Sequence, residues 1–383
     1  MQDPPTLTLP RARPAPAPVP TPAPRRAGRL SALDGMRLLA ALMVVAYHYM
    51  ALYGGWTTRG EALFPGSFPF TAYGWLGVEL FFLISGFVIC MSCWGRSLGD
   101  FFVSRVSRLY PAYWFAVLAT TAVLLLIPNG NNPLPVADVL TNLTMLEEPL
   151  GVPKVDGVYW TLFAELRFYL LFALMAWWGL TYRRVLAFCS VWAAAGMLFA
   201  QSDDSVLQLL IMPNYCWYFI AGMAFFLMYR FRPSLLLTGV VLVCFGAALP
   251  SAHDTWSRSL GYFRQSIPFW PVVAVLAVCF GAMALVATGK LDWMKWRWLP
   301  YAGALTYPLY LLHQYAGWEL IRALGHRLPP YTVLALVTGG MLVTSWLVHR
   351  LIERPVTRLL RRRLSGALAE ATAGERRLGS AGR

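Results

Sequence analysis

The chain has 383 residues, of which 58% are hydrophobic and only 13% are charged. Soluble domains carry about 25% charged residues, so a soluble protein of two or three domains is excluded because its surface could not cover so much apolar material. The formal net charge is +14, which in a soluble chain would indicate nucleic acid as a partner. Here the positive charges lie between apolar stretches and in the two tails, which is typical of a polytopic membrane protein.

Residues 1–30 form a tail rich in Pro, Ala and Arg that lacks core-forming residues. We expect this tail to be disordered and cytoplasmic. It is not a secretory signal, because proline occupies the place of the apolar region that such a signal needs. The membrane domain is predicted to cover residues 31–353, and residues 354–383 are expected to form a basic cytoplasmic tail.

Apolar segments follow one another along the membrane domain, each near the roughly 20 residues that a spanning helix needs. Ten are predicted, at 34–53, 75–94, 110–127, 158–179, 184–200, 206–229, 235–251, 268–288, 300–321 and 331–350. No internal repeat or interrupted helix is apparent. The sequence therefore predicts an all-α polytopic membrane protein with about ten transmembrane helices.

The distribution of basic residues sets the orientation of these helices. With the N-terminus in the cytoplasm, 24 Lys and Arg residues fall inside and six fall outside. This bias predicts both termini in the cytoplasm. The Ala, Arg, Pro and Leu content is typical of a bacterial source, so we expect a multi-pass protein of a bacterial cell membrane. The basic tail is expected to form a helix that lies on anionic lipid.

Ionisable side chains inside the predicted spans are costly and mark a functional site by default. They are Asp34, Arg37, His48, Glu79, Glu165, Arg167, His313 and Glu319. Arg167 needs a partner on another helix, because Glu165 points elsewhere on its own helix. Glu319 and Arg322 are three residues apart and are interpreted as a structural surface pair.

His48 lies in the outer half of the first span. Arg37 precedes it by eleven residues and shares its helix face, and Asp34 can pair with Arg37. Glu79, Glu165 and His313 reach a similar depth on other helices, which predicts one site with coupled proton affinities. Two simpler interpretations are possible. His48 could be a histidine at headgroup level in a belt of tyrosines, and the four ionisable residues at this depth could make unrelated packing contacts.

Arg105 and Arg108 lie three residues apart at the cytoplasmic entrance of the third span. Two arginines on one helix face form a fork that suits a phosphate. The alternative is a plain topology anchor, since arginine is common at that boundary. No Cys or His cluster has the spacing of a metal site, so no metal is expected.

Six stretches together resemble the acyltransferase 3 family of integral membrane acyltransferases. They are LDGMRLLAALMVVAYH, GVELFFLISGFVI, SRVSRLYPAYW, WTLFAELRFYLLF, TYPLYLLH and LIERP, in the order that the family shows. The resemblance runs from about residue 31 to 358. It implies transfer of an acyl group, acetyl or another short chain, from acyl-CoA to a hydroxyl of a carbohydrate or a glycosylated compound such as an antibiotic.

By this resemblance, His48 is the histidine required for catalysis. The other matching positions are the donor-handling pair Arg105 and Arg108, the first-helix pair Asp34 and Arg37, the acid Glu165 and the late histidine His313. Two positions depart from the family pattern: Leu38 replaces a frequent glycine, and Glu79 stands where aspartate is common. About 30 residues follow the last predicted span, so we expect no fused esterase-like domain.

These observations lead to a hypothesis for the reaction. Acyl-CoA enters from the cytoplasm with its phosphates on Arg105, Arg108 and Arg37, and neutral His48 removes the proton of the acceptor hydroxyl. Glu165 or Glu79 orients the imidazole, and His313 positions the acceptor or stabilises the oxyanion. One alternative forms an acyl-histidine intermediate. Another is a proton-coupled transporter of a glycan or small molecule, which also uses intramembrane His and Glu residues.

Overall fold

The computed structural model describes residues 30–127 and 132–381, so the predicted tail at 1–30 lies almost entirely outside the described residues. Every secondary-structure element of the described part is helical. Seven helical runs there are long and apolar enough to cross a membrane: Phe68–Cys93, Leu98–Leu126, Gly157–Trp177, Ser205–Phe231, Leu235–Leu260, Trp270–Ala287 and Pro330–Glu370. The all-helical fold with several candidate membrane-spanning helices is therefore confirmed, while the total of ten spans and the orientation of the termini stay predictions.

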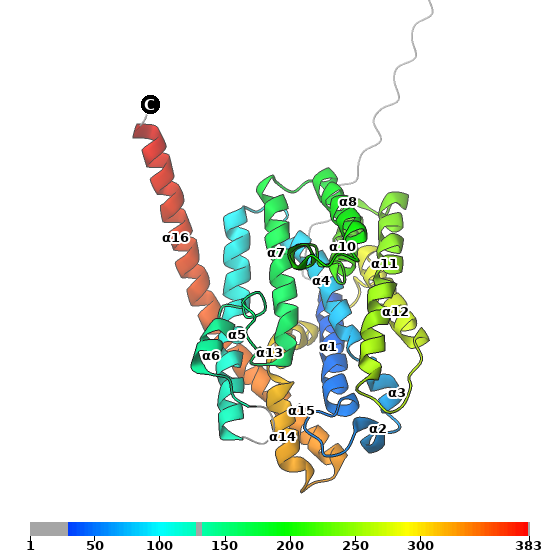
Figure 1. Ribbon diagram of the computed structural model, residues 1–383. Helices are drawn as coiled ribbons and strands as arrows, with labels where there is room; N and C mark the ends of the chain where they lie inside the picture. The colour runs from blue at the N-terminus through cyan, green and yellow to red at the C-terminus, as the bar shows by residue number, and fades with distance from the viewer. Residues whose placement is uncertain (1–29, 128–131, 382–383) are drawn as a thin grey trace, which may run out of the picture.

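Helices α4 (Leu76–Cys93) and α10 (Cys216–Phe231) form the centre of the bundle, with α1 (Ser31–Ala46) beside α4 (Figure 1). Small residues allow this close packing. A Cβ atom added to Gly86 would lie 2.2 Å from the carbonyl oxygen of Phe219, and one added to Gly222 would lie 2.2 Å from that of Leu83. The α4 and α10 backbones therefore touch where only glycine fits.

Helix α1 does not end as a regular α-helix. It passes directly into a π-helical turn, η1 (Tyr47–Ala51), which carries His48. π-Helical turns are rare and occur frequently at functional sites. The predicted first span is thus one continuous helical run whose last turn is widened around the candidate catalytic histidine.

The prediction of one unbroken span over 300–321 is wrong. The chain forms α13 (Leu299–Leu312), turns at His313 and Gln314, and resumes as α14 (Tyr315–Gly325). The predicted segment 206–229 is also interrupted, between α9 (Ser205–Ile211) and α10, where Met212 has a φ of 52°. The hydrogen bonds that hold the first break come from distant parts of the chain, so the local sequence did not reveal it.

The remaining helices surround this centre. They are α2 (Gly60–Leu63), α3 (Phe68–Thr71), α5 (Leu98–Leu126), α6 (Val136–Asn142), the 3-10 turn η2 (Gly157–Tyr159), α7 (Trp160–Trp177), α8 (Tyr182–Leu198), α11 (Leu235–Leu260) and α12 (Trp270–Ala287). Helix α5 begins twelve residues before the predicted third span, at 98 rather than 110. Arg105 and Arg108 therefore lie within a helix.

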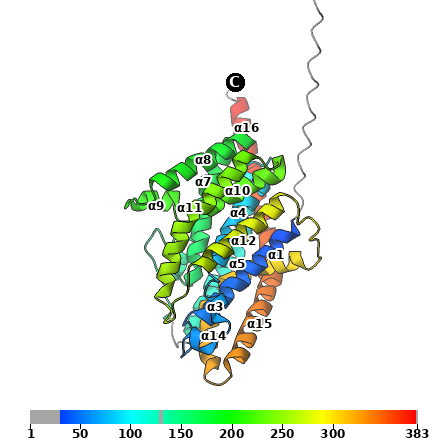
Figure 2. The same cartoon turned by 90° about the vertical axis from the view of Figure 1, so that its right-hand side faces the viewer.

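The C-terminal tail continues the last span without a break. Helix α15 (Pro330–Val348) passes through the π-helical turn η3 (His349–Glu353) into α16 (Arg354–Ala381). Helix α16 packs along α5 and reaches beyond the bundle at the end opposite to α14 (Figures 1 and 2). The expected helical tail is confirmed, and its contact with lipid stays a prediction.

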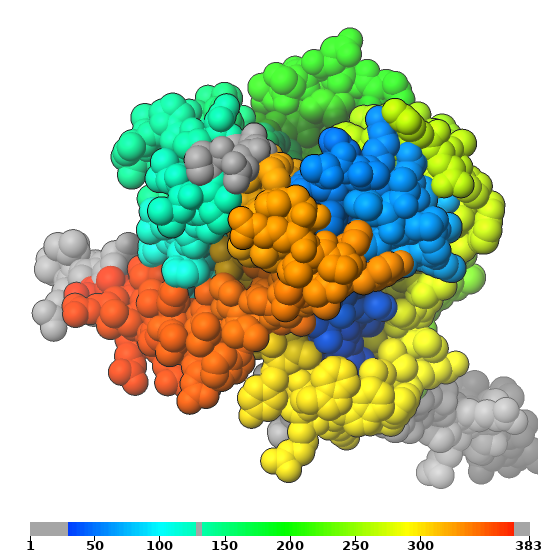
Figure 3. Space-filling model, turned by 90° about the horizontal axis from the view of Figure 1, so that it is seen from below, coloured from blue at the N-terminus to red at the C-terminus, as the bar shows by residue number. Residues whose placement is uncertain are grey.

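The α14 end of the molecule is the one that the predicted topology places outside. Figure 3 shows this face, on which the segment before α4, the C-terminal end of α5 and the region around α14 and α15 meet. Segments far apart in the sequence thus converge where η1 and the break after α13 lie.

Candidate active site

Two of the predicted site residues form a direct pair. Nδ1 of His48 lies 3.0 Å from Nε2 of His313, and the two ring centroids are 5.0 Å apart. His313 is completely buried, whereas His48 is half-buried. The shared depth that the sequence predicts for these histidines therefore corresponds to a contact between the π turn of the first helix and the break after α13.

The hydrogen bonds of the pair define the tautomers of the neutral rings. Nδ1 of His313 lies 2.7 Å from the carbonyl oxygen of Tyr310, which can only accept, so this nitrogen carries the proton and Nε2 is an acceptor. Nδ1 of His48 faces both that acceptor and the carbonyl oxygen of Val44 at 2.9 Å, so it must be the donor. The lone pair of His48 is consequently left on Nε2, where it is available as a base.

Backbone contacts fix both histidines. The indole of Trp318 donates to the carbonyl oxygen of His48 at 3.0 Å, and the hydroxyl of Tyr49 donates to that of His313 at 2.6 Å. Gly54 makes room for this arrangement, because a Cβ atom there would lie 1.9 Å from the Trp318 ring. His48 therefore contacts protein groups on α14 and at the helix break and is not one member of an exposed aromatic belt.

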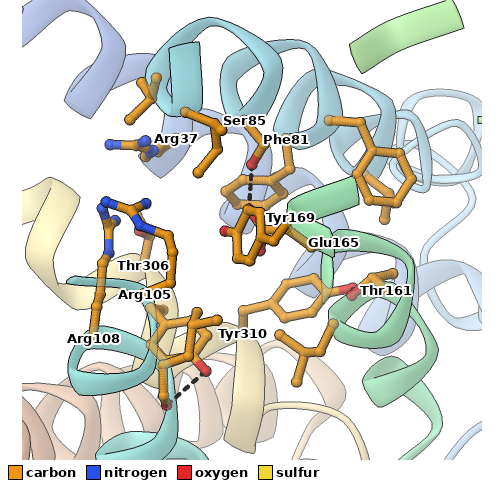
Figure 4. Close-up of a pocket in the computed structure, with 17 residues that line it drawn as sticks. Arg37, Phe81, Ser85, Arg105, Arg108, Thr161, Glu165, Tyr169, Thr306 and Tyr310 are labelled. Carbon is orange, nitrogen blue, oxygen red and sulfur yellow. Dashed lines mark hydrogen bonds between the residues drawn. The ribbon is translucent and has the colours of Figure 1, made fainter. Parts of the chain in front are cut away.

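A separate cavity lies between α1, α4, α5, α7 and α13, with about 770 Å³ of empty space including its open mouth. Arg37, Arg105 and Arg108 line one side of it (Figure 4). Arg105 is buried and Arg108 is exposed. Arg37 also pairs with Asp34, whose carboxylate lies 3.7 Å away. The structure thus brings the predicted donor-binding arginines together, and Asp34 supports one of them from outside the lining.

Glu165 lies in this cavity and not beside the histidines. Its Oε1 atom accepts a hydrogen bond from the hydroxyl of Ser85 at 2.5 Å, and Tyr169 lies next to it in the lining. Within the described part of the chain, Nδ1 of His48 lies within hydrogen-bond distance of Nε2 of His313 and of the carbonyl oxygen of Val44, and of no carboxylate. The expectation of a carboxylate that orients the imidazole is therefore wrong, since a second imidazole takes that position.

Glu79 joins neither group. It is buried, its Oε2 atom has no hydrogen-bond partner among the described residues, and it is absent from the cavity lining. Arg167 finds its partners elsewhere, at the carbonyl oxygen of Leu209 and at Glu148. Glu319 does pair with Arg322, at 2.6 Å, but it is completely buried, which corrects the interpretation of this pair as a surface feature.

Tyr310 contacts both the cavity and the histidine pair. Its ring lines the cavity, and its hydroxyl lies 2.9 Å from that of Thr161. Its carbonyl oxygen accepts from His313, whose ring centroid is 5.6 Å from that of Tyr310. Tyr310 is not among the predicted site residues, although its position one turn before His313 in TYPLYLLH places it on the same helix face.

The chain is similar in sequence to known acyltransferases. The model of an acyltransferase domain family matches residues 30–350, and the chain belongs to this family. Acyltransferase MdmB of Streptomyces mycarofaciens is 26% identical, over 90% of this chain and 96% of that protein. The exopolysaccharide production protein ExoZ of Rhizobium meliloti is 29% identical, over 77% of this chain and 94% of that protein.

A more distant relative is the putative peptidoglycan O-acetyltransferase YrhL of Bacillus subtilis, which is 24% identical over 37% of this chain and 23% of its own length. No solved structure matches this chain. The family identifies the protein as an acyltransferase. The break after α13 is a feature that transporters also show, but the family match favours the enzyme.

Proposed function

We propose that the protein is an O-acyltransferase of a bacterial cell membrane. It transfers an acetyl or other short-chain acyl group from acyl-CoA to a hydroxyl of a carbohydrate or glycosylated compound. The observation that carries this proposal is the His48–His313 pair, in which the hydrogen bonds leave a basic nitrogen on His48. Membership of the acyltransferase family and the names of ExoZ and YrhL support this substrate class.

The cavity suits the donor. Three guanidinium groups gather on one side of it, and the buried Nε atom of Arg105 has no hydrogen-bond partner in the described part of the chain. Guanidinium groups bind phosphate oxygens strongly. The CoA phosphates would therefore lie at Arg105, Arg108 and Arg37, and the thioester arm would extend between α4 and α13 toward Tyr310.

The reaction then needs few protein groups. The acceptor oxygen attacks the thioester carbonyl carbon while Nε2 of His48 takes the hydroxyl proton. The carbon–sulfur bond breaks, and the departing CoA thiolate takes that proton back from His48 to leave an ester and free CoA. His313 keeps the other nitrogen of His48 protonated and shares the charge of the imidazolium, which is the role of the carboxylate in a serine hydrolase triad.

This proposal is tested by supplying acetyl-CoA with a labelled acetyl group, and separately a longer acyl-CoA, to membranes that contain the protein. Membranes without the protein serve as the control. We expect labelled material that depends on the protein and whose ester is located by mass spectrometry on a hydroxyl-bearing glycan or glycoside. Transfer without acyl-CoA, or no transfer from any acyl-CoA, would overturn the proposed donor.

A further inference from the structure

Asp156 is a buried carboxylate outside the set of predicted site residues. It is completely inaccessible to solvent and lies in the loop before η2, just outside the candidate span Gly157–Trp177. Burial raises its pKa from 3.8 to about 7. Burial of a carboxylate is costly unless its oxygens accept hydrogen bonds.

Both oxygens of this carboxylate accept backbone hydrogen bonds, but from two different segments. Oδ1 accepts from the N–H of Val158 at 3.2 Å, and Oδ2 accepts from the N–H of Tyr315 at 3.0 Å. Val158 belongs to the turn that starts α7, whereas Tyr315 is the first residue of α14. One side chain therefore ties the start of α7 to the helix that resumes after the break.

The second of these bonds lies close to the reactive pair. Tyr315 follows His313 by two residues, and α14 also carries Trp318, which donates to the carbonyl oxygen of His48. A negative charge at the start of a helix is stabilising. Gln314, which lies between His313 and Tyr315, is also packed closely against the start of α7, since a Cβ atom on Gly157 would lie 2.7 Å from Oε1 of Gln314.

We propose that Asp156 is a positioning residue: it holds the broken segment that carries His313 and thereby maintains the hydrogen bond between His313 and His48. This inference rests on the proposed function. The loop before α7 would then control the geometry of the His48–His313 pair. The predicted topology places this loop outside. The titratable groups that sense its charge are four tyrosines on the surrounding elements, Tyr49, Tyr159, Tyr310 and Tyr315.

Two substitutions separate the contributions of Asp156. Asparagine offers only one accepting oxygen, so Asp156→Asn keeps one of the two hydrogen bonds. Its amide NH2 group faces the other backbone N–H, and the second hydrogen bond is lost because both groups are donors. Asp156→Ala loses both bonds. The matched control is Glu148→Gln, in the same loop. The Glu148 carboxylate is only part-buried, and it pairs with the side chains of Lys154 at 3.2 Å and Arg167 at 3.9 Å.

The first test needs neither donor nor acceptor. The full-length protein in lipid nanodiscs is treated with diethyl pyrocarbonate, which modifies unprotonated imidazole nitrogens, and modification of each histidine is followed by mass spectrometry. We expect His313 to be protected in the wild type and in Glu148→Gln. In both Asp156 variants its modification rate should rise at least about tenfold, while the exposed His253 serves as an unchanged reference.

Two results of this test would overturn the inference. One is unchanged protection of His313 in both Asp156 variants. The other is an equal rise at every histidine including His253, because Asp156 would then support the whole fold and not the pair. If Asp156→Ala does not fold, Asp156→Asn alone carries the test.

The second test is the pH profile of acetyl transfer. The wild-type rate should rise with pH through about 7 as Asp156 ionises and its hydrogen bonds strengthen, and Asp156→Asn should lack this rise. Identical profiles would contradict the positioning role. Absence of transfer in the wild type would overturn the proposed function alone, because the modification test does not depend on it.

Discussion

The role of His313 gives the sharpest prediction, because the structure assigns it a partner and a tautomer. His313→Ala removes the acceptor that faces Nδ1 of His48 at 3.0 Å, and among the described residues it leaves the carbonyl oxygen of Val44 as the hydrogen-bond partner of this nitrogen. His313→Gln is the matched variant, since the amide oxygen of glutamine can reach the position of the imidazole Nε2 and accept the same hydrogen bond.

The magnitude follows from what each variant keeps. Loss of one ordinary hydrogen bond costs about 1 kcal/mol, which is roughly fivefold in rate, and a base that is no longer positioned loses up to the 10²–10⁴-fold of general-base catalysis. Because Val44 still holds the ring of His48, we expect His313→Ala to lower kcat about 10²-fold. His313→Gln should stay within about tenfold of the wild type.

The assay is the initial rate of labelled acetyl transfer over a range of acetyl-CoA concentrations. His313 does not line the cavity, so the KM for acetyl-CoA should change little in either variant. Thermal unfolding measures whether the buried alanine destabilises the bundle. A wild-type kcat in His313→Ala, or an equal loss in the Gln and Ala variants, would refute the orienting role.

Two further predictions concern the cavity and the packing of the bundle. Arg105→Ala should raise the KM for acetyl-CoA by roughly 10- to 100-fold, because a charged hydrogen bond contributes about 1.5–3 kcal/mol. The control is Arg96→Ala, which lies outside the cavity lining and should leave this KM unchanged. Equal effects of the two substitutions on the KM would contradict a donor site in the cavity. Gly86→Ala should destabilise the protein by about 1–3 kcal/mol in thermal unfolding, because its methyl group would lie 2.2 Å from a backbone oxygen on α10. Gly246→Ala has open space around it, and a similar loss there would refute this explanation.

The sequence was sufficient for those parts of the fold that follow from local composition. Apolar length predicted the membrane helices, and the spacing of Arg105 and Arg108 predicted a shared helix face that now lines the cavity with Arg37. Depth along the helices placed His48 and His313 at one level, and the structure shows them in contact. These features depend on helix periodicity, which a single sequence contains.

What the sequence could not provide depends on contacts between distant segments. The break at His313 is held by Asp156 and Tyr49, which lie far from it in the chain. Depth alone also grouped Glu79 and Glu165 with the histidines, although each faces a different part of the bundle. Depth gives only the position of a side chain along the membrane normal. The rotation of each helix about its own axis decides which side chains meet.

The central claim is that Nε2 of His48 takes the proton of the acceptor hydroxyl. The most direct measurement compares labelled acetyl transfer by the wild type, by His48→Ala and by His253→Ala in membranes with equal amounts of folded protein. We predict that the wild type and His253→Ala transfer equally, and that His48→Ala loses at least about 10²-fold of this rate. Undiminished transfer by His48→Ala would contradict the claim.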